Sequence, residues 1–171
     1  MIAYHNMKLS SSEEGMNTLI PVNTPFLNGS EKRYLQECID SGWVSSEGPF
    51  VKEFEEEFAD LVGRKYAVSV TSGSAALEVA VTATRIEEGD EVIMPTFTII
   101  SCIAPLIRVG AVPVLVDADP ITWNMAVEQI EGKITSRTKA IMVVHTYGLP
   151  VDMDPVLALA KEYDLIVIED A

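Results

Sequence analysis

The sequence has few cysteines, few basic residues and no long apolar run. Its two cysteines, Cys38 and Cys102, lie far apart, outside any CxxC pattern and away from metal-ligand spacing with His5 or His145. This argues against a disulfide framework or a metal cluster, and it fits reduced thiols in a cytoplasmic protein. Because 12 lysines and arginines stand against 26 acids, the net charge of −14 disfavours nucleic-acid and acidic-membrane partners.

No apolar segment approaches the roughly 20 residues that a membrane-spanning helix needs. The first segment, residues 1–17, lacks the basic start and apolar centre of a signal peptide. We expect it to be a loose leader, or a misassigned start with Met16 as the true first residue. Residues 18–171 are long enough for one domain with a core, and 48% apolar and 22% charged residues are typical of globular proteins.

Helical periodicity alternates with short, wholly apolar segments along this domain. Strands are predicted over residues 66–70, 90–95, 111–117, 139–145 and 165–170. Helices are predicted over residues 30–42, 50–64, 74–85, 98–110, 124–134 and 154–163. Apolar strands separated by helices indicate an α/β fold with a mostly parallel sheet covered on both faces, which makes three layers. In such sheets the ligand lies at the carboxyl ends of the strands.

The turn "TSGS", residues 71–74, joins a predicted strand to a predicted helix. Free N–H groups and the helix dipole make such a helix start suitable for an anion. Gly73 would allow close approach of the backbone, and Ser74 would add a hydroxyl donor. An ordinary turn with a serine cap explains the same letters equally well. The pattern is neither GxGxxG nor GxxxxGK[ST], so a nicotinamide-binding Rossmann domain is disfavoured.

Asp170 lies at the carboxyl end of the last apolar strand. A carboxylate at that point could cap a following helix. It could also form a charge-assisted hydrogen bond with a cationic ring nitrogen. A phosphate-binding turn after one strand and an acid after another suit a phosphorylated heteroaromatic cation.

Six segments in their order and spacing resemble the DegT/DnrJ/EryC1/StrS family of pyridoxal-phosphate-dependent sugar aminotransferases. They are "DSGWVSSEGPFVKEFEEEFA", "VTSGSAALEVAV", "GDEVIMPTFTIIS", "GAVPVLVDAD", "TKAIMVVHTYGLPVDMD" and "LIVIEDA". The resemblance runs from about residue 20 to residue 171, and two of the segments are similar to the branch that makes perosamine. It implies the fold of aspartate aminotransferase (fold type I), with residues 18–171 as the amino-terminal part of an incomplete large domain.

The resemblance also implies roles for four residues toward pyridoxal 5'-phosphate (PLP). Gly73 and Ser74 would hold the phosphate, and Asp170 would pair with the ring nitrogen and keep it protonated. Ile99 takes the position over the ring, where the family usually has an aromatic residue, so stacking would be weaker. The implied partners are a nucleotide-linked keto-deoxy-sugar, an amino donor such as glutamate and a second subunit in a homodimer. The implied pathway is polysaccharide or O-antigen biosynthesis.

The family's Schiff-base lysine is implied to lie beyond this chain, so no catalytic residue is assigned within it. Seven lysines are present outside the expected context: Lys8, Lys32, Lys52, Lys65, Lys133, Lys139 and Lys161. We therefore expect an inactive fragment that folds poorly alone, because the implied neighbours of the strand at 66–70 come later in the chain. A sugar 3-dehydrase, with histidine in place of that lysine, and a non-catalytic fragment remain open alternatives.

Overall fold

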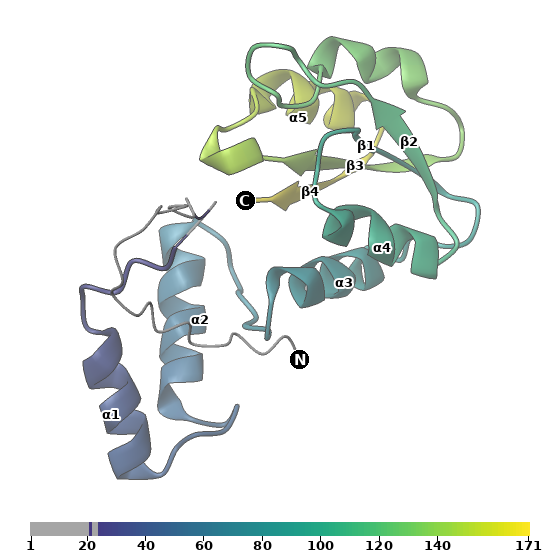
Figure 1. Ribbon diagram of the computed structural model, residues 1–171. Helices are drawn as coiled ribbons and strands as arrows, with labels where there is room; N and C mark the ends of the chain where they lie inside the picture. Colours follow the sequence, from purple (N-terminus) through teal and green to yellow (C-terminus); the bar gives the residue numbers. More distant parts are fainter. Residues whose placement is uncertain (1–20, 22–23) are drawn as a thin grey trace, which may run out of the picture. The chain divides into compact units, whose positions relative to one another are not determined.

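In this computed structural model, the structure describes residue 21 and residues 24–171. They belong to two compact units, one within residues 1–50 and the other formed by residues 51–171 (Figure 1). The predicted leader, residues 1–17, lies outside the described residues.

The first unit contains helix α1, Glu31–Ser41, as the periodicity of its sequence predicts. Ser30 occupies the N-cap position but its side chain makes no capping bond. The carboxylate of Glu31 accepts the N–H of Gly29 at 2.8 Å, which places a negative charge at the helix start. Gly42 ends the helix in the left-handed conformation that glycine adopts without steric cost.

The second unit alternates helices and strands. Helix α2, Pro49–Leu61, begins at the end of the first unit and continues into the second. The later helices are α3, Gly73–Ala83; α4, Ile100–Arg108; and α5, Met153–Glu162. The strands are β1, Glu91–Pro95; β2, Val112–Val116; β3, Thr138–Val144; and β4, Ile166–Asp170. Three short 3-10 segments are η1, Val127–Gln129; η2, Glu131–Lys133; and η3, Thr146–Gly148.

The four strands form one parallel sheet in the order β2-β1-β3-β4. From β1 the chain crosses through α4 to β2 on one side, and then returns to β3 on the other side of β1. The direction of winding therefore reverses between β1 and β3. A reversal of this kind is where open α/β sheets bind ligands, at the carboxyl ends of the two strands.

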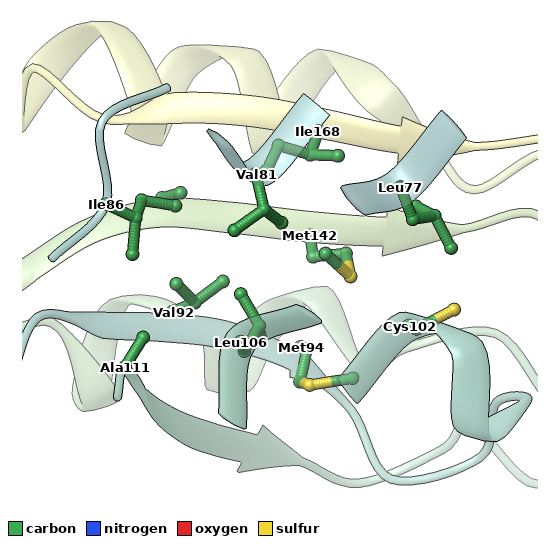
Figure 2. Packing of buried hydrophobic residues seen from close by; sticks show 11 residues of the cluster. Leu77, Val81, Ile86, Val92, Met94, Cys102, Leu106, Ala111, Met142 and Ile168 are labelled. Carbon is green, nitrogen blue, oxygen red and sulfur yellow. The ribbon is translucent and has the colours of Figure 1, made fainter. Parts of the chain in front are cut away.

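Each face of the sheet is covered by helices, because the buried strands alternate apolar side chains between two cores (Figure 1). On one face α3 and α4 pack against Val92, Met94 and Met142, and Figure 2 shows this cluster. On the other face α5 and the η1–η2 region cover Ile93 and Ile141. The predicted three-layer arrangement is confirmed.

A buried polar cluster lies at the amino end of the sheet, opposite the carboxyl edge. The Glu91 carboxylate accepts hydrogen bonds from the hydroxyl groups of Thr135 and Thr138 and from the guanidinium of Arg137. The Thr135 hydroxyl and the Arg137 guanidinium lower the pKa of the Glu91 carboxyl, against the opposing effect of burial. The cluster ties β1 to the start of β3.

We expect this cluster to make stability depend on pH. Because the folded-state pKa of Glu91 is lowered, its contribution is present above the ordinary glutamate pKa of about 4.3 and is lost as pH falls through the lower folded value. Thermal unfolding followed from neutral to acid pH should show that loss, and Glu91→Gln should be less stable at neutral pH and less acid-sensitive. The exposed Glu128→Gln serves as the control for losing a carboxylate. Equal curves for the two variants would contradict the prediction.

Two predicted elements are wrong for this chain. Residues 66–70 form no strand, and the N–H of Ser69 is bound by the Glu55 carboxylate at 2.7 Å. The segment lacks sheet neighbours, as the implied fold leads one to expect. The predicted helix at 124–134 is replaced by η1 and η2, which still bury Ile130. The buried Asn124 amide forms hydrogen bonds with Thr146 and Leu149. The segment therefore begins with an isolated β-bridge between Ala118 and Met125 and not with a helix.

Within the part of the chain that the structure describes, no helix has the length and apolar character that a membrane crossing requires.

Candidate functional site

A cleft lies where the winding of the sheet reverses. The segments that follow β1 and β3 separate there, since α4 covers one face of the sheet and α5 the other. The cleft has a volume of about 420 Å³ and is lined by Phe97, Thr98, Ile99, Val144, His145, Thr146 and Tyr147. The predicted residue Ile99 therefore lines the cleft, and the residue is 62% exposed.

The turn that the sequence predicts to bind an anion lies at the start of α3. Ser72 is the N-cap, and its hydroxyl oxygen accepts the N–H of Ala75 at 3.2 Å. The N–H groups of Gly73 and Ser74 precede the first intrahelical bond, so they can face a bound anion. Gly73 has an ordinary backbone conformation, and a Cβ built on it meets no atom of the described chain within 4 Å. Its predicted role thus rests on space for a ligand and not on strain.

The first turn of α4 connects the turn at 71–74 to Asp170. The hydroxyl groups of Ser74 and Ser101 lie 2.8 Å apart. The adjacent residue Cys102 donates its S–H to Oδ2 of Asp170 at 3.1 Å. Ser74 and Asp170, which are 96 positions apart in sequence, are therefore both hydrogen-bonded to the first turn of α4.

Asp170 is the last residue of β4, paired with Val144 at the end of β3. Its carbonyl oxygen accepts the N–H of His145 at 2.9 Å. Its half-buried side chain extends toward the α4 side, where Cys102 contacts it. The acid is therefore fixed by backbone and side chain at the carboxyl edge of the sheet.

Burial dominates the chemistry of Cys102. Its side chain is fully buried, and it lies at the carboxyl end of the cluster that Figure 2 shows. Burial raises the pKa of the Cys102 thiol to about 11, with a smaller raising effect of Asp170 and an opposing effect of the Thr98 hydroxyl. The thiol is therefore protonated at neutral pH and can act as a hydrogen-bond donor.

His145 is held by the backbone of Val151 and by the side chain of Glu169. Nδ1 accepts the N–H of Val151 at 3.1 Å, so the neutral ring carries its proton on Nε2. Nε2 lies 3.5 Å from Oε2 of Glu169. This arrangement orients the loop after β3.

The sequence of the chain matches one protein family over most of its length. The sequence profile of the DegT/DnrJ/EryC1/StrS aminotransferase family matches residues 25–171. The chain belongs to this family. The family resemblance predicted from the sequence motifs is confirmed.

The chain is also similar to individual curated proteins of this family. The chain is 50% identical over 151 residues to a GDP-perosamine synthase of Escherichia coli O157:H7, covering 88% of this chain and 42% of that protein. It is 49% identical over 152 residues to the GDP-perosamine synthase of Caulobacter vibrioides, covering 89% of this chain and 41% of that protein. The chain thus spans about two fifths of the length of these relatives.

Solved structures of the family share the fold. An aminotransferase from Psychrobacter cryohalolentis is 38% identical, with a TM-score of 0.76 over 85% of this chain and 37% of that one. An E. coli GDP-4-keto-6-deoxy-D-mannose-3-dehydratase with bound hydrated PLP is 32% identical, with a TM-score of 0.82 over 88% and 40%. The predicted fold class, an incomplete domain of the PLP-dependent aminotransferase type, is confirmed.

Sequence reasoning missed three polar residues of the site: Thr98, Ser101 and Cys102. Thr98 lies two residues before α4, and Ser101 and Cys102 follow three and four positions later in the first turn of that helix. That spacing places them on one side of a helix start, which is the signal that could have found them. The roles of Gly73, Ser74, Ile99 and Asp170 toward a ligand stay predictions.

Proposed function

We propose that the protein containing this chain is a PLP-dependent aminotransferase that transfers an amino group, with glutamate as donor, to a GDP-linked 4-keto-6-deoxy-sugar. The product would serve polysaccharide or O-antigen biosynthesis. The observation that carries the proposal is the 50% identity to a GDP-perosamine synthase over 88% of the chain. Because the chain spans 42% of that relative, the activity belongs to a protein with more than these residues.

The described residues fit PLP at both ends of the cofactor. The N–H groups of Gly73 and Ser74, with the Ser74 hydroxyl, offer donors for a phosphate without requiring a cation. Asp170 offers a carboxylate for the ring nitrogen, and Ile99 offers an apolar surface beside the cleft. The connection through Ser101 and Cys102 ties these groups together.

When bound, PLP would supply the electron withdrawal that lets a C–H bond next to the amino nitrogen break. Asp170 would hold a proton on the ring nitrogen, because an anionic carboxylate favours the cationic ring. Gly73 and Ser74 would orient the cofactor through its phosphate. The described residues thus hold and tune the cofactor, and the proton transfers at the substrate require groups from the rest of the protein.

A homodimer in the cytoplasm completes the proposal. Val79 on α3 and Ile100 and Ile107 on α4 expose apolar side chains, which a second copy would cover. The two cysteines are free thiols, as is usual in the cytoplasm.

A sugar 3-dehydrase is the second candidate, because dehydratase structures share the fold at a TM-score of 0.82. The family resemblance implies that the distinguishing residue, lysine or histidine, belongs to the part of the relatives that this chain does not span. The coding sequence that continues the reading frame decides between the two: lysine in that position supports the aminotransferase and histidine the dehydrase.

The test of the proposal is a chimera that joins residues 21–171 to the remaining carboxyl-terminal part of the E. coli O157:H7 relative. Incubated with PLP, glutamate and GDP-4-keto-6-deoxymannose, it should form a GDP-linked amino-sugar detectable by mass spectrometry. The intact relative is the positive control. A folded chimera that binds PLP but makes no amino-sugar, while the relative does, would refute the proposed substrate.

Gly73→Val should weaken PLP binding by the chimera roughly tenfold or more, about 1.4 kcal/mol. The branched side chain has free space within the described chain, so its effect should appear only where a phosphate would lie. Fluorescence titration with PLP measures the affinity, and thermal unfolding checks that stability is nearly unchanged.

Gly132→Val is the matched control, since a Cβ at Gly132 also meets no atom of the described chain within 4 Å. Gly132 lies in η2 and does not line the cleft. If Gly73→Val binds PLP as tightly as Gly132→Val, Gly73 is only a residue of the turn.

A further inference from the structure

We propose that Cys102 is a positioning residue, whose S–H holds Oδ2 of Asp170 while Thr98 fixes the direction of the thiol. The carboxylate then presents its other oxygen to the ring nitrogen of PLP. This inference rests on the proposed function and deepens it, because it assigns a role to a buried thiol that neither the family motif nor the relatives' names include.

The direction of the two hydrogen bonds follows from their chemistry. A carboxylate only accepts, so Cys102 must be the donor to Asp170 across the 3.1 Å contact. The thiol has one hydrogen, so the Thr98 hydroxyl must be the donor to Sγ across 3.0 Å. The two hydrogen bonds therefore run in one direction, from Thr98 to Cys102 and from Cys102 to Asp170.

These two hydrogen bonds leave one oxygen of Asp170 available. Within the described residues Oδ2 receives the Cys102 thiol and Oδ1 has no hydrogen-bond partner. A carboxylate with one oxygen held can rotate less than a free one, so less conformational entropy is lost when a cation binds to the other oxygen. Burial of Cys102 keeps water from replacing the thiol as the donor.

The helix that carries Cys102 needs such side-chain support. Pro105 lies inside α4 and has no N–H to donate to the carbonyl oxygen of Ser101, so the first turn lacks one backbone bond. The bonds from Thr98 to Cys102, from Cys102 to Asp170 and between Ser101 and Ser74 involve this same turn. The first turn of α4 therefore sets the spacing between the turn at 71–74 and the acid.

An ordinary buried cysteine acts as a small apolar side chain. On that view serine at position 102 is at least as harmful as alanine, because serine adds a polar group to a core. A positioning role predicts the opposite order, since the serine hydroxyl can donate to Asp170 and alanine cannot. The two substitutions therefore distinguish the two roles.

The first experiment reads the hydrogen bond without cofactor, by infrared spectroscopy of the S–H stretch in the 171-residue chain. A Cys38→Ser background leaves Cys102 as the only thiol. Donation to a carboxylate weakens the S–H bond, so Asp170→Asn should shift the band to higher frequency. An unchanged band would overturn the proposed contact.

The second experiment measures the PLP affinity of the chimera by fluorescence titration, with thermal unfolding in parallel. Cys102→Ala should bind PLP roughly threefold to tenfold more weakly, and Cys102→Ser should restore most of the loss. Equal affinity of the alanine variant and the unsubstituted chimera would overturn the proposal, as would weaker binding by the serine variant than by the alanine variant.

Two further outcomes keep the inference separate from the proposed function. If the unsubstituted chimera does not bind PLP but the infrared shift occurs, the cofactor assignment fails and the hydrogen bond stands without that role. If Cys102→Ala does not fold, Thr98→Val replaces it, because it keeps the shape of residue 98 and removes only the donor to Sγ. Unchanged PLP affinity in Thr98→Val would then contradict the proposed positioning of Asp170 by Thr98 and Cys102.

Discussion

Asp170→Asn should lower the amination rate of the chimera roughly tenfold to hundredfold while PLP stays bound. The amide is nearly the same size as the carboxylate, so packing at the end of β4 is kept. It is neutral, and a neutral group does not favour the protonated, cationic form of the ring. Steady-state kinetics give kcat, and titration with PLP gives the cofactor affinity of the same preparation.

Glu169→Gln is the control for this substitution. Glu169 is the preceding residue of β4, is more exposed and contacts His145. Successive side chains of a strand point to opposite faces, so Glu169 does not share the α4 side with Asp170. Near-normal turnover in Asp170→Asn, equal to that of Glu169→Gln, would mean that Asp170 is only a structural end of the strand.

The sheet could be predicted from the sequence because its strands are buried on both faces. The segments at 92–95 and 140–144 are apolar at every position, and a strand of a parallel sheet that is covered by two helical layers has this composition. The segment at 66–70 has a similar composition but no partner within this chain. Composition identifies a segment that can form a strand, whereas pairing depends on other parts of the chain.

The helix predicted at 124–134 failed for a related reason. Its apolar spacing fits a helix, and Met125 and Ile130 are indeed buried. However, the amide of Asn124 donates to the carbonyl oxygen of Leu149 and accepts the N–H of Thr146. These bonds to a distant loop stabilise a different backbone path, and nothing in the local pattern reveals them.

The same distinction between local and long-range information applies to the candidate site. The turn at 71–74 could be identified because a segment with the composition of a strand, a glycine and a helix start are neighbours in sequence. The contact between Cys102 and Asp170 joins residues 68 positions apart. It exists only because α4 packs on the same face of the sheet toward which Asp170 points, and a single sequence does not fix that geometry.

The largest effect is expected when the 171-residue chain is mixed with PLP, reduced with borohydride and analysed by mass spectrometry. No single lysine should carry a stoichiometric adduct. A lysine that bonds to the cofactor needs a lowered pKa, which burial or a neighbouring cation provides. Among the described lysines, five are exposed and one is half-buried, and none lines the cleft: Lys32, Lys52, Lys65, Lys139 and Lys161, and Lys133.

The chimera provides the contrasting result, because it adds the part of the E. coli relative in which the family's lysine is implied to lie. After the same treatment it should carry one adduct per chain, located in the added part. Scattered, substoichiometric labelling of the 171-residue chain agrees with surface amines reacting at random. A stoichiometric adduct on one of its own seven lysines would contradict the proposed division of labour, in which these residues hold the cofactor and the remaining part supplies the amine that bonds to it.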